Sequence, residues 1–516
     1  MECNTLVRYT VGAVLLVAIL IVGVGKVVSQ PYRTLFVDDD DPTCGGNSPC
    51  YRTIQEAVTA AQPGDTVKIR PGRYYGPIWI DKSLTLSGES ADLVTLNYSP
   101  DVPAPRSTLL QISGPVVVGP ARVTIEHISI RWEAFAHAGI WITGKNPQVI
   151  IRQIRVLGHF FGIVMLGVKD VPLVGGWLAI SDSELSDTGI LIETDSPDVQ
   201  RIEGNKLMNS GISLRGRGRA IINKNEIFGR GTGNGIFLGD FVSATLRENL
   251  IRNHNQGVWV SGNAQIQMHG NKILDNYSNG VVIEEAAQAD LIGNHIIANG
   301  LESRVGSGLF YDPFFGFLGY KFRPSGFGIA VGDGASVNLM ENHIEGNLFG
   351  LGATLTLETA SQKIRIPQFK AQRNVITENG WGIWLRGVEA TLFSNEITGN
   401  GIEALFNPAL ATMLDLFFPA SGVLIQGGKP LLQVNRIAHN DLGVVVQAEA
   451  SPGLWGNQIL QNSGYGIALY QGNCFSYIDP GLAFQGTVVG EANQLMNNGK
   501  GDLCPPDYPW PSGFRK

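Results

Sequence analysis

An asparagine recurs along most of this chain at nearly regular intervals, and this repeat constrains the fold more than any other feature. The short intervals are 20 to 24 residues, and in most copies an aliphatic residue follows two positions later. The recurring asparagines are Asn205, Asn225, Asn249, Asn271, Asn294, Asn342, Asn374, Asn395, Asn435, Asn457 and Asn493. Each repeat also holds a Gly-Ile-x-Val type of segment. This pattern predicts an all-β fold, a single right-handed parallel β-helix in which each repeat forms one coil.

The repeated residue types also suggest what happens at the turns. Asparagine is a poor strand residue, so its recurrence predicts a turn in which amide side chains stack and hydrogen-bond from coil to coil. The glycine before each Ile-x-Val segment is expected to supply a backbone bend that other residues resist. Residues 66–503 would form roughly sixteen coils, a rod on the order of 75 Å long.

A short amphipathic helix is predicted where the chain enters the repeats. Thr53 and Glu56 have the spacing of a capping box, and apolar residues between Ile54 and Ala61 fall on one helical face. Short strands are predicted to follow over 66–69, 78–80 and 84–86. A helix at this point would cover the open end of the stacked sheets, whose edges and apolar interior need a cap.

The segment 1–29 reads as a targeting signal. Arg8 precedes an apolar run from Val11 to Gly25, which suits a signal peptide, with an uncleaved membrane anchor over residues 9–25 as the alternative. Both interpretations predict export to the periplasm, the cell surface or the medium. The expected organisation is a linker over 30–52, the β-helix over 53–504 and a tail over 505–516.

The cysteines agree with export. Apart from Cys3 in the targeting segment, they fall in two local pairs at the two ends of the domain: Cys44 with Cys50, and Cys474 with Cys504. We predict two disulfides that fasten the ends of the solenoid, where a repeat protein frays most easily. Such bonds require an oxidising compartment.

Motifs near the amino-terminal entry carry a family resemblance. They are Phe36-Val37-Asp38-Asp39-Asp40, Thr53-Ile54-Gln55-Glu56-Ala57, Pro63-Gly64-Asp65-Thr66 and Pro71-Gly72-x-Tyr74. This entry resembles that of exported bacterial right-handed β-helix proteins of the pectin-lyase-like superfamily. The group includes pectate lyases, pectin methylesterases, polygalacturonases, mannuronan epimerases and the periplasmic copper-binding accessory proteins of nitrous oxide reductase. The resemblance implies the fold, whereas function has to be argued from a site.

One outer row of side chains is expected to decide between binding and catalysis. In each Gly-Ile-x-Val segment the two aliphatic residues should point inward and the x residue outward. This row carries no charged residue, which speaks against catalysis along it. Its aromatic members, which suit stacking against sugar rings or a partner protein, are Trp141, Phe237, Trp259 and Trp384. Cover by loops or by a second chain is the alternative.

Two long insertions are predicted between the asparagine turn and the Gly-Ile strand, over residues 301–327 and 402–421. Both are rich in aromatic or aliphatic residues, and long loops on a solenoid commonly carry function. We expect the two to pack together over Trp384 and its neighbours, with two walls of a groove as the alternative.

Charged residues one position further along the same strands are the catalytic candidates. Glu193 and Arg215 should face outward there, with Asp240 beside them. These three are the best catalytic candidates for a polysaccharide lyase, glycoside hydrolase or epimerase. The alternative is that they form a solvated ladder of ion pairs with no catalytic role. The carboxylates of Asp38 to Asp41 could bind Ca²⁺, although such a loop is more often solvated or caps backbone amides.

A metal site is suggested by His295 and His343, which occupy the same position after the ladder asparagine in successive repeats. Adjacent coils would bring the imidazoles to about 5 Å, provided that the first insertion hides no coil. Copper is one candidate ion, but no Cys or Met joins the pair, and His254 and His439 lie elsewhere on the rod.

The net charge of the chain bears on whether nucleic acid could be a partner. The net charge of −7 leaves no excess of basic residues to neutralise phosphates, so nucleic acid is not expected as a partner. The preferred hypothesis is an exported, non-catalytic recognition or scaffold protein that binds polysaccharide or another cell-envelope component. The alternatives are a polysaccharide lyase, hydrolase or epimerase, and a periplasmic copper-binding accessory protein.

Overall fold

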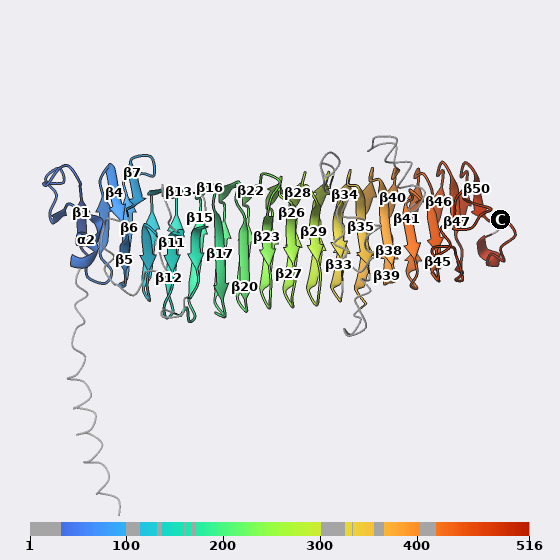
Figure 1. Ribbon diagram of the computed structural model, residues 1–516, viewed down its shortest axis with the longest axis horizontal. Coiled ribbons are helices and arrows are strands. Elements are labelled where there is room, and N and C mark those ends of the chain that lie inside the picture. The colour runs from blue at the N-terminus through green and yellow to red at the C-terminus, as the bar shows by residue number, and fades with distance from the viewer. Residues whose placement is uncertain are drawn as a thin grey trace, which may run out of the picture.

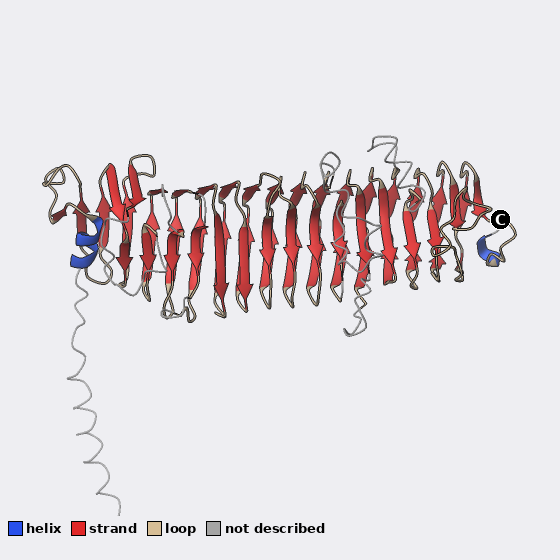
Figure 2. Ribbon diagram, in the orientation of Figure 1, coloured by secondary structure: helices blue, strands red, loops and turns tan. Residues whose placement is uncertain are grey.

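The chain forms one long rod of stacked parallel strands, as a computed structural model shows (Figure 1). The structure describes residues 32–99, 114–131, 137–158, 161–167, 172–300, 326–332, 334–354, 366–401 and 419–514. Three parallel sheets run the length of the rod, and each coil contributes one strand to each sheet (Figure 2). The predicted all-β parallel β-helix is therefore confirmed. Two of the sheets have 16 strands each, which agrees with the prediction of roughly sixteen coils.

Sheet A contains the first strand of each coil in chain order. It has 18 strands, of which β1 and β2 precede the first full coil, and β1 lies between β2 and β3. The strands are β1 (Thr34–Val37), β2 (Cys50–Tyr51), β3 (Thr66–Ile69), β6 (Leu84–Gly88), β9 (Arg122–Glu126), β12 (Gln148–Arg152), β15 (Trp177–Ser181), β18 (Val199–Glu203), β21 (Arg219–Asn223), β24 (Ser243–Arg247), β27 (Gln265–His269), β30 (Gln288–Ile292), β33 (Ser336–Met340), β36 (Gln368–Gln372), β39 (Glu389–Phe393), β42 (Leu431–Gln433), β45 (Gly453–Trp455) and β48 (Val489–Glu491).

Sheet B follows each asparagine turn and has mostly three-residue strands. They are β4 (Gly72–Gly76), β7 (Val94–Tyr98), β10 (Ser129–Arg131), β13 (Arg155–Leu157), β16 (Glu184–Ser186), β19 (Lys206–Met208), β22 (Glu226–Phe228), β25 (Leu250–Arg252), β28 (Lys272–Leu274), β31 (His295–Ile297), β34 (His343–Glu345), β37 (Val375–Thr377), β40 (Glu396–Thr398), β43 (Arg436–Ala438), β46 (Gln458–Leu460) and β49 (Gln494–Met496). The central residue of nearly every strand is a buried aliphatic residue, such as Ile227 or Ile273.

Sheet C is formed by the Gly-Ile-x-Val segments. Its strands are β5 (Ile78–Ile80), β8 (Val116–Val118), β11 (Ala138–Ile142), β14 (Phe161–Met165), β17 (Gly189–Thr194), β20 (Ile212–Gly216), β23 (Asn234–Leu238), β26 (Gln256–Val260), β29 (Asn279–Ile283), β32 (Phe327–Val331), β35 (Phe349–Thr354), β38 (Trp381–Arg386), β41 (Val423–Gln426), β44 (Val444–Gln447), β47 (Tyr465–Leu469) and β50 (Gly501–Cys504). As expected from the two-residue period, both aliphatic residues of each segment point into the core, for example Val258 and Val260.

Both ends of the rod are closed. Helix α2 (Ile54–Ala60) has the predicted capping box, because the Thr53 hydroxyl accepts from the Glu56 amide at 3.2 Å and Glu56 accepts from the Thr53 amide at 3.1 Å. It packs on the core at the amino-terminal end (Figure 2). At the other end Trp510 and the 3-10 helix η5 (Ser512–Phe514) bury aromatic side chains in the same core.

Both predicted disulfides are present, Cys44–Cys50 beside the helical cap and Cys474–Cys504 at the last coil. The targeting segment 1–29 lies outside the described residues, as do nearly all of the two predicted insertions. Within the described ranges, no helix has the length and apolar character needed to cross a bilayer.

The asparagine ladder predicted from the repeat is confirmed between sheets A and B. Asn294 shows its pattern: its carboxamide oxygen accepts from the amide and the side chain of Asn271 at 3.0 and 2.9 Å, and its own Nδ2 donates to Asn342 at 2.9 Å. A second ladder runs on the other side of sheet B, formed by Asn276, Asn299, Asn347, Asn379, Asn400, Asn440, Asn462 and Asn498. Each ladder pairs backbone amides that the turns leave without strand partners.

The glycines that precede the sheet C aliphatics are required for space. A Cβ on Gly328 would lie 2.6 Å from the carbonyl oxygen of Gly350 in the next coil and 2.8 Å from Nδ2 of the ladder residue Asn347. Gly257, Gly280, Gly350 and Gly382 meet equivalent atoms, Gly422 meets the ladder residue Asn440, and none of these glycines has a positive φ. The expected glycine-specific bend is therefore wrong here, because coil stacking and the second ladder exclude a side chain.

Val434 is a β-branched residue at a left-handed position, in the turn that precedes the first ladder. That position has a positive φ in every ladder coil, and Val434 adopts it at φ 56° with a β-branched side chain that is 56% exposed. Val434→Gly should raise the free energy of unfolding by about 1 kcal/mol, because it relieves left-handed strain and loses little packing. Denaturant unfolding would measure the change. The reverse substitution one coil later, Gly456→Val, should lower it, and equal stability in both variants would contradict this reading.

His254 takes the place of a ladder asparagine and makes stability depend on pH. Its amide donates to Asn276 Oδ1 at 3.0 Å, and its ring is buried, which lowers the pKa of His254 to about 4. Between pH 6.5 and 4 the unfolded chain binds a proton that the folded chain excludes, so stability should fall by about 3 kcal/mol as pH falls through this window. His254→Asn should remove this loss, as unfolding at pH 7.5 and 4.5 would show. A parallel decline in both proteins would assign the pH effect to other groups.

Candidate functional site

The outer face of sheet C contains the aromatic row predicted from the sequence, but only its middle is open. Trp141 is 7% exposed and Trp384 is 2% exposed, whereas Phe237 and Trp259 are half-buried. The row is therefore covered at Trp141 and Trp384, whereas a ligand could reach it at Phe237 and Trp259. A ligand would reach Trp141 or Trp384 only by displacing the side chains packed on them.

The cover near the carboxyl-terminal half is an aromatic stack. Phe327 and Phe349 stack with ring centroids 4.7 Å apart, Phe349 stacks on Trp381 at 4.6 Å, and Phe327 lies 5.9 Å from Trp384. The indole nitrogen of Trp384 donates to Gln426 at 2.9 Å. These contacts form a second hydrophobic core outside the coil interior, which gives Trp384 a structural role in this arrangement.

A smaller cluster covers the row near the amino-terminal end. It packs Trp79, Val117, Ala138 and Val164 with Trp141, whose indole nitrogen donates to the Leu166 carbonyl at 3.1 Å. Trp141 is therefore also part of a packed surface layer.

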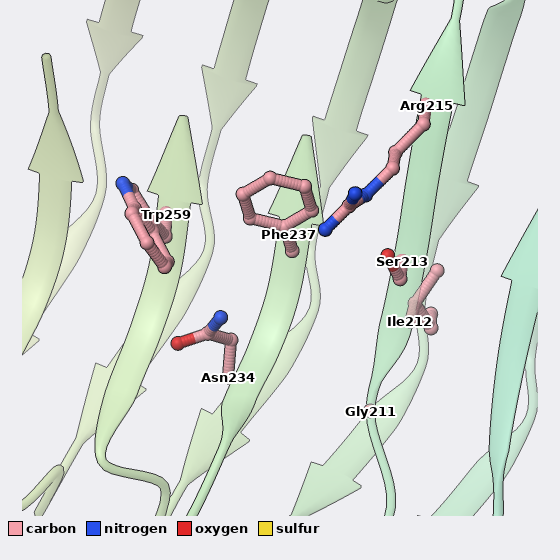
Figure 3. A pocket seen from close by; sticks show the side chains of 7 residues that line it. All are labelled: Gly211, Ile212, Ser213, Arg215, Asn234, Phe237 and Trp259. Carbon is pink, nitrogen blue, oxygen red and sulfur yellow. The ribbon is translucent and has the colours of Figure 1, made fainter. Parts of the chain in front are cut away.

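Between these two clusters lies an open region that we call the central window, formed by Ser213, Arg215, Asn234, Phe237 and Trp259 on strands β20, β23 and β26 (Figure 3). These residues, with Gly211 and Ile212, line a shallow hollow of about 250 Å³. The rings of Phe237 and Trp259 meet edge to face, with centroids 5.2 Å apart and an interplanar angle of 73°. The indole nitrogen of Trp259 donates to Glu284 at 2.8 Å, which fixes the ring orientation.

Polar groups border the aromatic pair. The guanidinium of Arg215 lies 5.0 Å from the Phe237 ring centroid, a cation–π contact, and Figure 3 shows Arg215 reaching toward that ring. Asn234 stands at the start of β23 below the two rings (Figure 3). Sequence reasoning did not single out Asn234, because Gln256 and Asn279 occupy the same register position in the next coils and no signal separates them.

The three catalytic candidates are only partly brought together. Glu193 and Arg215 are register partners on β17 and β20, and both are exposed. Asp240 lies in the turn after β23, where its carboxylate accepts from the Gly216 amide at 3.0 Å. Asp195 and Glu285 accept from backbone amides of neighbouring coils in the same way. The carboxylate of Asp240 thus has a structural task in joining adjacent turns.

The acidic amino-terminal loop brings Asp38, Asp39 and Asp40 within 4.8 Å of one another. Asp38 accepts from the amides of Asp40 and Asp41, and a side-chain hydrogen bond with Asp38, together with its negative charge, raises the pKa of Asp40. Hydrogen bonds from Thr43 and Gly45 lower the pKa of Asp41. These bonds are those of a turn that caps its own backbone amides, the alternative to Ca²⁺ binding that the sequence left open.

The two candidate metal-binding histidines are neighbours. β31 pairs directly with β34, so His295 and His343 share a register position and the first insertion adds no coil between them. Their ring centroids are 5.7 Å apart, close to the expected separation. His254 is buried in the second ladder and does not join this pair.

A family model and several solved structures are similar to this chain. Residues 188–364 match the family described as "Right handed beta helix region", in agreement with the parallel β-helix fold described above. No curated protein matches it. Similar solved structures include the periplasmic alginate epimerase AlgG (13% identity, TM-score 0.33, 83% of this chain and 77% of that one) and the Azotobacter vinelandii mannuronan C-5 epimerase AlgE4 A-module (11% identity, TM-score 0.27, 87% and 93%). The pectate lyase Pel9A is another (14% identity, TM-score 0.22, 72% and 78%).

Proposed function

We propose that this is an exported recognition protein that binds a carbohydrate of the cell envelope at the central window, without catalysing its conversion. The observation that carries the proposal is the accessible Phe237–Trp259 pair, bordered by Arg215 and Asn234, in a row where Trp141 and Trp384 are covered. Ring faces of this kind stack on the C–H faces of sugars, while amide and guanidinium groups donate hydrogen bonds to hydroxyl or carboxylate oxygens. Two disulfides support an oxidising compartment, in line with an exported protein.

The shape of the window favours an extended ligand. The hollow is shallow and crosses strands β20, β23 and β26, which lie side by side in register. A chain laid across three coils would cover about 10 Å, a length suited to an oligosaccharide segment and not to an enclosed small molecule.

The test is carbohydrate binding with Trp259→Ala. Glycan-array screening of the wild-type protein would identify a ligand, and Trp259→Ala should weaken binding at least tenfold, the effect of losing about 1.4 kcal/mol of contact. Trp455→Ala is the matched control, because Trp455 is an exposed tryptophan (37%) on the outer face of sheet A. Equal losses in both variants, or no glycan bound by the wild-type protein, would refute binding at the window.

Turnover is the competing function, and the adjacency of Glu193 and Arg215 is the observation that favours it. We expect no unsaturated or reducing ends to form when acidic and neutral polysaccharides are incubated with the protein. Product formation that disappears in Glu193→Gln would overturn the non-catalytic assignment while leaving the window as the binding surface.

A further inference from the structure

The outer face of sheet B carries an imidazole pair in the same column of residues as a series of alternating charges. In the coils nearer the amino terminus, Arg155, Glu184, Lys206 and Glu226 follow one another in register, so opposite charges face each other. Arg155 donates to Glu184 at 3.1 Å within this series. The same column then places His295 directly beside His343, two groups that would repel each other when protonated.

The separation of the two rings fits one shared metal ion. Bonds of about 2.0–2.1 Å from a divalent ion to two imidazole nitrogens place the ring centroids roughly 5 to 6 Å apart at tetrahedral or wider angles. The observed centroid separation is 5.7 Å and the rings are tilted by 33°. The pairing of β31 with β34 in register places the two side chains on the same face of sheet B in adjacent coils.

A carboxylate orients one of the imidazoles. Glu345 lies two residues after His343 on the same face of β34, and its Oε2 is 2.6 Å from His343 Nε2. A neutral His343 that donates from Nε2 keeps the lone pair of Nδ1 for a metal ion. Ligating histidines characteristically donate their other nitrogen to a carboxylate in this manner, which fixes the tautomer and raises the basicity of the ligand.

We propose that His295 and His343 bind a divalent transition-metal ion such as Zn²⁺ or Ni²⁺, with Glu345 as the residue that positions His343. Imidazole nitrogen is a preferred ligand of these ions, whereas Ca²⁺ and Mg²⁺ prefer oxygen ligands. The site lies on a different sheet from the central window, so it is independent of carbohydrate binding.

The surroundings set the strength of the site. Lys272 precedes His295 in the same column and opposes a cation, while Val375 follows His343. His295 is exposed and His343 half-buried, so water completes the coordination and screens the lysine charge. Two protein ligands with open positions predict an exchangeable ion, unlike a closed structural site with four protein ligands.

Isothermal titration of the full chain with ZnCl₂ tests the site, using protein without a polyhistidine tag and treated with chelator. We expect one ion per chain, a tenfold or greater loss of affinity in His295→Ala and in His343→Ala, and a loss of about tenfold in Glu345→Gln. The matched control is His269→Ala, a half-buried histidine on β27 of sheet A, which should bind as the wild type does.

A second readout separates ligation from folding. Zn²⁺ should raise the melting temperature of the wild-type protein and of His269→Ala, and should leave that of the two alanine variants at 295 and 343 unchanged. Absence of Zn²⁺ binding to the wild-type chain, or equal binding by wild type and His295→Ala, would overturn the proposal. Binding lost in His269→Ala alone would place the ion on sheet A instead.

Discussion

Asn294→Ala should lower the free energy of unfolding by about 4 kcal/mol, the largest loss we expect from a single substitution that adds no atoms. Asn294 is fully buried, and its carboxamide accepts from the amide and the side chain of Asn271. Its Nδ2 donates to the Met268 carbonyl at 3.0 Å and to Asn342 at 2.9 Å. Alanine leaves two donors and a carbonyl without these partners, and each buried polar group left unpaired costs about 1–3 kcal/mol.

The measurement is chemical denaturation monitored by circular dichroism and by tryptophan fluorescence, because a solenoid can lose its coils unevenly. Asn338→Ala is the matched control. Asn338 lies on the outer face of β33, where it donates to Asp290 at 2.8 Å within reach of solvent, and its loss should cost less than about 0.5 kcal/mol. Similar losses for the two variants would mean that the ladder contributes no more than an ordinary surface hydrogen bond.

The ladder was predictable because asparagine has few reasons to recur every 20 to 24 residues in a chain of short apolar strands. The disulfides followed from spacing, and the capping helix from Thr53 and Glu56. The second ladder was visible only as an asparagine five positions later in several copies. Its earlier coils hold other residues, which hide the pattern. The Ser210 hydroxyl accepts from the Thr188 amide of the preceding coil, and the His254 amide donates to Asn276 of the next coil.

The binding surface was harder to predict for a physical reason. Strand periodicity states which side of the sheet a residue faces, but it does not state what lies on top of it. Trp259 and Trp384 have the same position in their coils, yet Trp384 is covered by Phe327 and Phe349 from neighbouring strands. Those two phenylalanines stand at the first position of β32 and β35, where the three preceding coils carry Asn234, Gln256 and Asn279. The sequence alone did not reveal that the phenylalanines fold over the row.

Gly350→Ala should be the second strongly destabilising substitution, with a loss of about 2–4 kcal/mol. The added methyl would lie 2.6 Å from the carbonyl oxygen of Gly382, 2.9 Å from Nδ2 of Asn379 and 3.0 Å from its Cγ. Asn379 is a buried member of the second ladder and donates to Asn400 at 3.0 Å. To admit a methyl group, either two coils must separate or the ladder must break. Both changes cost more free energy of folding than the small volume of a methyl group suggests.

The control substitution distinguishes crowding from the general effect of adding a methyl to this sheet. Gly332 follows β32 on the same side of the rod, has no positive φ, and an added Cβ would meet only ordinary contacts, the nearest being Glu284 Cβ at 3.4 Å. Gly332→Ala should therefore be neutral or slightly stabilising, because alanine restricts the unfolded chain. Thermal and denaturant unfolding of both variants would measure the difference. If Gly350→Ala were as stable as Gly332→Ala, close stacking between coils could not be the reason for glycine at this position, and the bend first expected from the sequence would have to be reconsidered.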